Sequence, residues 1–257
     1  MSLSGPALIS ALVAGAVAGF LSGFLGIGGA LITTPIIRVI LRQPAYIALG
    51  TTVPLLLPTA ALAAFRYSRD GHVDFRLAAL ASSGAAVTAV LAGNETRVIP
   101  GEALMIATAV VMIALGAGMF SERAFVAVRQ FTGRLAVSHD ILAVVSGILA
   151  GAAAGFLGIG GGFVLVPAFS YVLQVDTRTA FGTSLAVIAV VAVPSTIVHA
   201  MLGHVSWQLA AVLAISVVPF SYLGASAAAR VPDAVARRLF SVFLVVVGIW
   251  FALFEGR

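Results

Sequence analysis

The sequence predicts an all-α, polytopic membrane protein made of two inverted repeats, and three observations support this fold class. Hydrophobic residues make up 61% of the 257-residue chain and charged residues only 9%, whereas ordinary soluble domains carry about 25% charged residues. Long stretches, such as 1–37 and 179–229, contain no Asp, Glu, Lys or Arg, and about 20 apolar residues suffice for a helix to cross a bilayer. The third observation is that the two halves of the chain match.

An offset of 132 residues aligns the two halves without a gap. The string GFLGIGG at 23–29 recurs letter for letter at 155–161, and shorter matches follow it at the same offset. These shorter matches are Pro35 with Pro167, Gly50-Thr51 with Gly182-Thr183, Gly71-His72-Val73 with Gly203-His204-Val205, and Pro100 with Pro232. The chain is therefore a tandem duplication, with a first membrane repeat at 1–120, a cytoplasmic linker at 121–140 and a second membrane repeat at 141–257.

Each repeat is predicted to contain about five hydrophobic segments. In the first repeat they are 7–25, 29–41, 45–67, 75–93 and 101–120. The segment 29–41 would be only about 20 Å long as a helix, so it is expected to be a half-helix or a re-entrant arm, with 162–173 as its equivalent. The chain then has 8–10 membrane segments, with one short or re-entrant segment in each repeat.

The arginines favour an inverted arrangement of the repeats. If each repeat changes sides an odd number of times, ten arginines fall on one face and four on the other, whereas an even number divides them equally. Because positive residues concentrate on the cytoplasmic side, the uneven division is favoured, with both termini outside. The face with ten holds Arg66, Arg69, Arg76, Arg123, Arg129, Arg134, Arg178, Arg230, Arg237 and Arg238, and the other holds Arg38, Arg42, Arg97 and Arg257.

The duplicated glycine string interrupts a long apolar run in each repeat. Backbone groups that leave a helix inside the bilayer must be satisfied by protein or by a bound group. A helix that begins after the glycines presents free N–H groups and its positive dipole end to an anion, and glycine lets the backbone approach an oxyanion closely. The alternative is that these glycines serve close helix packing. The candidate substrate-binding residues are Gly26, Gly28, Gly29, Gly158, Gly160, Gly161 and Gly162.

The second duplicated motif supplies hydroxyl groups. Thr51 and Thr52 in the first repeat, and Thr183 and Ser184 in the second, can donate hydrogen bonds to an oxyanion or a sulfonate. The alternative is that each hydroxyl bonds back to its own helix. His199 lies near the end of an apolar run and is the candidate for proton coupling, because histidine titrates near neutral pH.

Several other classes of function are disfavoured. The chain has no cysteine, so it has no disulfide or thiolate metal site, and neither a metal nor a cofactor is expected. Acidic residues mark segment ends, which gives carboxylate relays little support. An arginine excess in a membrane protein reports orientation, so nucleic acid is not an expected partner. The expected partners are a small anionic substrate and the lipid bilayer, and a homodimer is one alternative for the oligomeric state.

The two glycine strings, the prolines that follow them and the Gly-Thr-Thr and Gly-Thr-Ser motifs resemble the sulfite exporter TauE/SafE family. This resemblance implies a transporter, not an enzyme, of sulfur-containing anions such as sulfite, sulfoacetate or other organosulfonates in the bacterial inner membrane. The first copy departs from the second at Ala30, where Gly162 stands, and at Thr52, where Ser184 stands, so the half-sites are expected to be unequal. An anion channel of similar build and, more weakly, a membrane-embedded enzyme are the alternatives.

Overall fold

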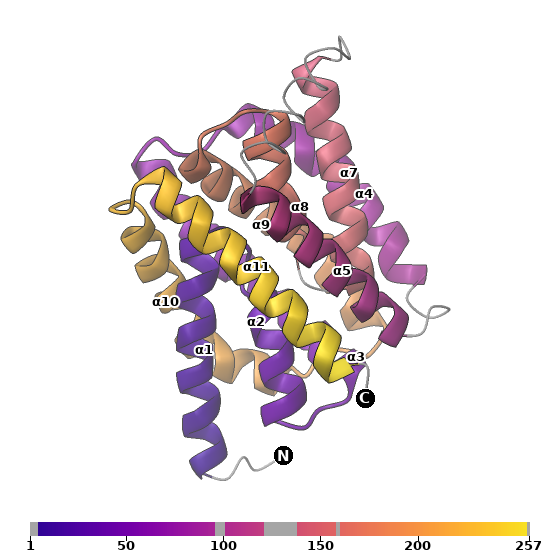
Figure 1. Cartoon of the computed structure of the whole chain (residues 1–257). Coiled ribbons are helices and arrows are strands. Elements are labelled where there is room, and N and C mark those ends of the chain that lie inside the picture. The colour runs from indigo at the N-terminus through magenta and orange to yellow at the C-terminus, as the bar shows by residue number, and fades with distance from the viewer. Residues whose placement is uncertain (1–4, 96–100, 121–137, 158–159, 256–257) are drawn as a thin grey trace.

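The computed structural model describes residues 5–95, 101–120, 138–157 and 160–255, and within them every regular element is a helix (Figure 1). The first repeat contains α1 (Gly5–Leu25), α2 (Ala30–Pro35), the π-helical segment η1 (Ile36–Ile40), α3 (Ala45–Arg69), α4 (Phe75–Glu95) and α5 (Gly101–Phe120). The second contains α7 (His139–Leu157), α8 (Gly162–Pro167), the π-helical segment η2 (Ala168–Val172), α9 (Thr177–Met201), α10 (Trp207–Ala228) and α11 (Asp233–Glu255). Most of the predicted linker, together with Gly158, lies outside the described residues.

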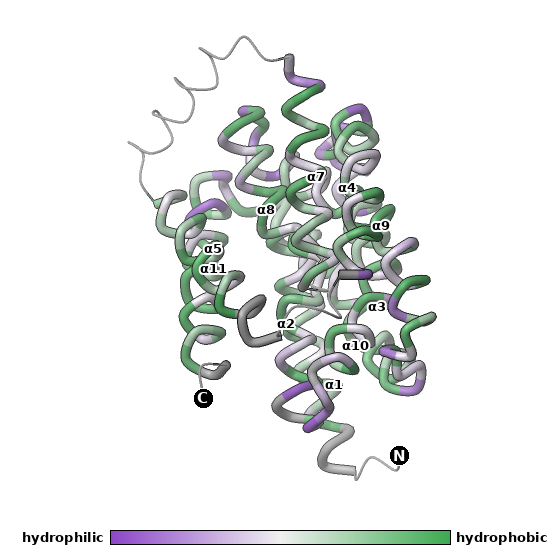
Figure 2. Tube along the Cα trace, turned by 90° about the vertical axis from the view of Figure 1, so that its right-hand side faces the viewer, coloured by the Kyte–Doolittle hydropathy of each residue, from purple (hydrophilic) through white to green (hydrophobic). Residues whose placement is uncertain are grey.

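The helices have the lengths and the polarity that a membrane requires. Six of the described helices, α3, α4, α7, α9, α10 and α11, are long and apolar enough to cross a bilayer, and three shorter apolar segments accompany them. Figure 2 shows that hydrophilic residues gather mainly near helix ends. The predicted polytopic, all-α fold is confirmed.

The two repeats are related by an approximate two-fold axis. α1 packs against α10, and the equivalent pair α7 and α4 packs in the same way. Other main contacts join equivalent helices, α3 with α9 and α5 with α11, and the matching pairs α3 with α10 and α9 with α4. Since α1 lies against a helix of the second repeat, and α7 against a helix of the first, the repeats interlock.

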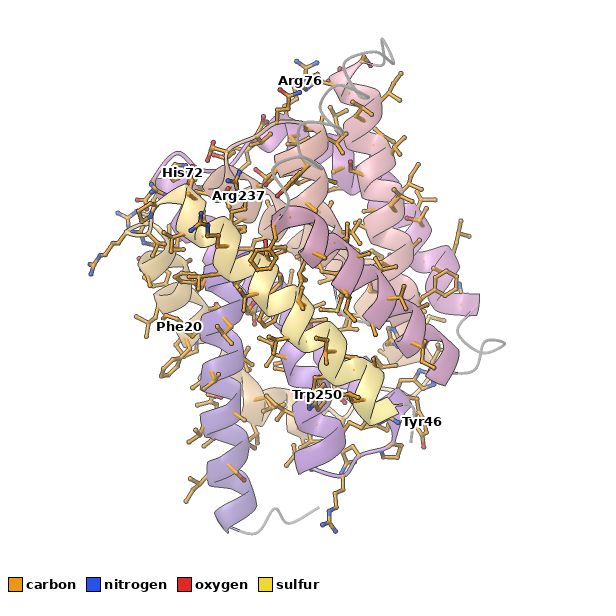
Figure 3. The ribbon with its side chains drawn as sticks, in the orientation of Figure 1. Phe20, Tyr46, His72, Arg76, Arg237 and Trp250 are labelled. Carbon is orange, nitrogen blue, oxygen red and sulfur yellow. The ribbon has the colours of Figure 1, made fainter. Side chains whose placement is uncertain are left out.

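The equivalent helices run in opposite directions. α1 begins and α11 ends at the same end of the molecule, whereas α7 begins at the opposite end (Figure 1). α1 and the short α2 and η1 form a hairpin, after which α3 runs the length of the molecule from Tyr46 towards His72 (Figure 3). The end of the molecule at which His72 lies also holds Arg76 and Arg237 (Figure 3). Both arginines belong to the face predicted to be arginine-rich. The observed directions are those of inverted repeats.

A stripe of glycines lets α1 approach α10 closely. Gly15, Gly19 and Gly23 recur once per helical turn, and a Cβ atom at Gly19 or Gly23 would collide with a backbone carbonyl of α10. Small residues at this spacing are typical of close contacts between membrane helices. Gly147, Gly151 and Gly155 of α7 repeat the arrangement against the backbone of Ala81, Ala85 and Ala89 on α4. The first glycine of each duplicated string therefore serves helix packing.

A large side chain in this stripe is expected to destabilise the protein. In the Gly19→Leu variant the side chain meets the backbone of Val217 and forces α1 away from α10, at a cost of about 1–3 kcal/mol or more. Thermal unfolding in detergent micelles measures this loss. Gly118→Leu is the matched control, because nothing lies within 4 Å of its Cβ position, and an equal loss in both variants would contradict the packing role.

Candidate functional site

The duplicated glycine strings form two breaks in which the backbone adopts a left-handed conformation. In the first break φ is 70° at Gly26, 80° at Gly28 and 72° at Gly29, and in the second it is 81° at Gly160 and 67° at Gly161. Residues with a side chain rarely adopt these values, because the Cβ atom approaches the neighbouring carbonyl oxygen. Glycine is thus what allows the chain to turn from α1 into α2, and from α7 into α8.

The two breaks meet at the interface between the repeats. A Cβ atom at Gly162 would lie 2.8 Å from Cα of Ile27 and 3.0 Å from the carbonyl oxygen of Gly26. Gly28 and Gly160 both face Leu56 and Ile188, which are themselves equivalent positions of the two repeats. The structure therefore brings the predicted residues Gly26, Gly28, Gly160 and Gly162 together at the approximate two-fold axis.

Side chains from α3 and α9 satisfy the backbone of the first break. The hydroxyl of Ser184 lies 2.6 Å from the carbonyl oxygen of Gly26 and 2.8 Å from that of Phe181. The buried hydroxyl of Tyr67 lies 3.2 Å from the carbonyl oxygens of Gly23 and Phe24. These carbonyls belong to the end of α1 and the break, where intrahelical donors are missing. The break is stable in an apolar interior because the protein supplies those donors.

The other predicted hydroxyls have different neighbours. The Thr51 hydroxyl accepts a hydrogen bond of 2.9 Å from the Ser206 N–H, and the Thr183 hydroxyl accepts one of 3.0 Å from the Asp74 N–H. These two equivalent bonds hold the turns that precede α10 and α4 against the opposite repeat. The Thr52 hydroxyl lies 2.7 Å from the Leu49 carbonyl oxygen and 3.2 Å from the hydroxyl of Thr34 on α2. The Ser184 hydroxyl is thus the predicted group that bonds to the backbone of the first break, at Gly26.

His199 occupies the position of the second repeat that corresponds to Tyr67 in the first. It is buried in the last turns of α9, and its Nδ1 atom has no hydrogen-bond partner among the described residues. Its ring centre is 5.8 Å from that of His204, which in turn is 5.4 Å from the ring of Tyr46. Tyr46 marks the end of the molecule opposite to His72 (Figure 3). Proton coupling through His199 stays a prediction.

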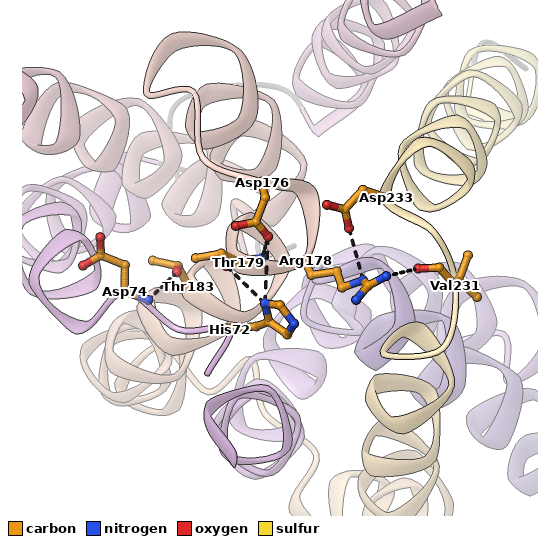
Figure 4. A network of polar contacts seen from close by, with 8 residues as sticks. All are labelled: His72, Asp74, Asp176, Arg178, Thr179, Thr183, Val231 and Asp233. Carbon is orange, nitrogen blue, oxygen red and sulfur yellow. Dashed lines mark hydrogen bonds and ion pairs between the residues drawn. The ribbon is translucent and has the colours of Figure 1, made fainter. Parts of the chain in front are cut away.

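Charged side chains form a separate network at the arginine-rich end (Figure 4). Arg178 pairs with Asp233 at 3.1 Å and donates to the Val231 carbonyl oxygen at 2.8 Å. In the same view, His72 Nδ1 is 3.3 Å from the hydroxyl of Thr179 and 3.9 Å from the carboxylate of Asp176. These contacts join helix ends, whereas the groups that contact the breaks are neutral. No group of three His, Asp or Glu able to hold a metal occurs in the described part of the chain.

Two hydroxyl-bearing residues beside the first break, Ser22 and Thr59, are absent from the sequence-based prediction. The Cβ position of Gly29 is 3.3 Å from Ser22 Oγ and 3.7 Å from Thr59 Cγ2, and both residues are buried. Ser22 immediately precedes the glycine string, and this position was the available signal. Thr59 carries no comparable signal, because it lies in the middle of an apolar helix with no motif around it.

Comparisons with known proteins agree with this architecture. Residues 11–251 match the family described as "Sulfite exporter TauE/SafE". A "Probable membrane transporter protein" of Xylella fastidiosa strain 9a5c is 28% identical over 88% of this chain and 87% of its own length. The "Probable membrane transporter protein YdhB" of Bacillus subtilis strain 168 is 25% identical over 88% of this chain and 92% of its own.

No solved structure matches the chain significantly. The family match spans both glycine breaks and nearly all of both repeats. The chain belongs to the sulfite exporter TauE/SafE family of membrane proteins.

Proposed function

We propose that the protein is a secondary transporter of small sulfur-containing anions, such as sulfite or an organosulfonate, and that the anion binds where the two glycine breaks meet. The observation that carries this proposal is the contact between the two breaks at the approximate two-fold axis. Inverted repeats with broken helices facing each other are typical of secondary transporters. The family description and the names of the relatives support transport.

The chemistry of the breaks favours an anion. The N-cap residues of α2 and α8 are Gly29 and Gly161, which form no side-chain cap hydrogen bond, and each helix continues directly into its π-helical segment. In α2 the N–H of Ala30 donates to the Gly28 carbonyl oxygen and that of Ile32 to the Gly29 carbonyl oxygen, so the attraction for negative charge comes from the positive end of the aligned backbone dipoles. The surrounding donors are neutral hydroxyls instead of arginines. Neutral donors hold an anion less tightly than a charged pair does, which suits a site that must release its substrate.

The centre of the site is closed in this structure. Leu56 and Ile188 are almost fully buried and pack against the glycines of both breaks. An anion can therefore pass only if the breaks and these two side chains move apart. A requirement for movement favours a carrier with alternating access over an open channel.

Flux through the purified protein in proteoliposomes tests this function. Radiolabelled sulfite or sulfoacetate is expected to enter with saturable kinetics and to show countertransport when unlabelled anion is present inside. Flux that neither saturates nor shows countertransport would indicate an anion channel. If no tested sulfur oxyanion crosses the membrane, the proposed substrate class is wrong.

Replacement of the central glycines is expected to reduce flux strongly. In Gly28→Leu and Gly160→Leu the new side chain strains a left-handed residue and meets Leu56 or Ile188, which should block the movement of the breaks. Gly71→Leu is the matched control, since its φ is 77° but nothing lies within 4 Å of its Cβ position. Flux is expected to fall by about tenfold or more in the first two variants, the factor for roughly 1.4 kcal/mol of added strain, and to remain in the control.

If the Gly28→Leu and Gly160→Leu variants transport as well as the control does, these glycines do not belong to the transport site. Measurement of initial flux at equal protein incorporation separates a lost site from poor reconstitution. A thermal unfolding scan of each purified variant identifies any loss of folded protein.

A further inference from the structure

Two buried hydroxyls beside the first break have no hydrogen-bond partner in the described part of the chain. Ser22 on α1 is 0% exposed and Thr59 on α3 is 1% exposed, and neither hydroxyl oxygen has a partner there. Hydroxyls in membrane helices usually bond to a carbonyl of their own helix, as those of Ser146 and Thr88 do. A buried polar group without a partner costs about 1–3 kcal/mol. Two such groups at one place therefore require a reason.

Both side chains lie against the bare backbone of Gly29. Ser22 Oγ is 3.3 Å and Thr59 Cγ2 is 3.7 Å from the point at which a Cβ atom of Gly29 would stand. Rotation about χ1 of Thr59 would bring its Oγ1 to the position of Cγ2. The Ser221 hydroxyl also donates to the Thr59 carbonyl at 3.1 Å, which fixes the α3 backbone at this point. Ser22, Thr59 and the left-handed Gly29 thus form one cluster, in which the Ser22 hydroxyl and the Thr59 methyl group face the glycine.

Other hydroxyls without partners do not share this position. Ser82, Ser170 and Ser195 are buried and lack partners in the described part of the chain, but none of them is among the atoms nearest to the Cβ positions of the described break glycines. Ser22 and Thr59 are distinguished by their common neighbour, Gly29.

The second break lacks these hydroxyls. At the 132-residue offset, Ser22 corresponds to Ala154 and Thr59 corresponds to Val191, and both of these residues are buried. Gly161, the equivalent of Gly29, faces the backbone of Ala150 instead. The scaffold is symmetric, but the hydroxyls at the breaks are not.

We propose that Ser22 and Thr59 bind the transported anion by donating hydrogen bonds to its oxygens, so that the first repeat alone supplies this polar part of the site. This inference rests on the proposed function and names the side chains of its substrate site. In the closed state the hydroxyls are buried in protein, and they gain their acceptor when the first break separates from α3. Binding the anion would therefore explain why the two hydroxyls have no hydrogen-bond partner among the described residues in the closed state.

Nearly isosteric variants test the inference. Ser22→Ala and Thr59→Val remove the hydroxyls with little change of volume. Each is expected to raise the KM for radiolabelled sulfite in proteoliposomes by about tenfold or more, the factor for one lost hydrogen bond to a charged group. Each is also expected to keep or raise the Tm in detergent, because the closed state loses no hydrogen bond. A purely structural role would lower the Tm instead.

Two control variants separate loss of anion binding from loss of stability. Ser82→Ala removes a buried hydroxyl that has no partner among the described residues and is not among the atoms nearest to the described break glycines, and should keep or raise the Tm while leaving KM unchanged. Ser184→Ala removes the bond to the Gly26 carbonyl and should lower the Tm. Unchanged KM values in Ser22→Ala and Thr59→Val overturn the inference, while the proposed function still stands if the wild-type protein transports sulfite.

A binding measurement decides the inference separately from flux. Sulfite or sulfoacetate is expected to raise the Tm of the wild-type protein and not that of the Ser22→Ala, Thr59→Val double variant. An equal rise in both proteins overturns the inference and leaves the proposed function in place. No rise in the wild-type protein with either anion also overturns it.

Discussion

The arrangement of the protein depends on satisfying the backbone where two helices stop inside an apolar interior. Carbonyl groups left free at the end of α1 find donors in the hydroxyls of Tyr67 and Ser184, since lipid offers none. These donors come from α3 and α9, and Ser184 belongs to the opposite repeat. The first break is therefore stable only within the assembled pair of repeats, which places it at the interface where transport requires a site.

Symmetry and divergence have separate roles in the structure. The equivalent bonds from Ser206 to Thr51 and from Asp74 to Thr183, like the two glycine stripes, preserve the common scaffold. The differences gather around the breaks. Tyr67, which caps α1, corresponds to His199, and Ser22 corresponds to Ala154. Duplication supplied the two opposed breaks, and the residues at equivalent positions around them have diverged.

Much of the fold follows from the sequence because its signals are long. The 132-residue offset, the short segments after the glycines and the uneven division of arginines predicted the helices and their opposite directions in the two repeats. That the repeats interlock, with α1 packed on α10 and α7 on α4, was not predicted. The residues of the candidate site were harder to predict from the sequence. Helices that are apolar on every side carry no periodic signal for the face that points inward, so the packing role of Gly23, the turn contact of Thr51 and the cluster of Ser22 with Thr59 required coordinates.

A structure of the protein determined with bound sulfite or sulfoacetate tests the central claim most directly. Density for the anion is expected between the two breaks, with its oxygens within hydrogen-bond distance of Ser22 Oγ and the backbone at Gly29. Density elsewhere would contradict it, above all in the surface pocket lined by Arg66 and Arg69. In that case the meeting of the two glycine breaks would have to be explained by helix packing alone.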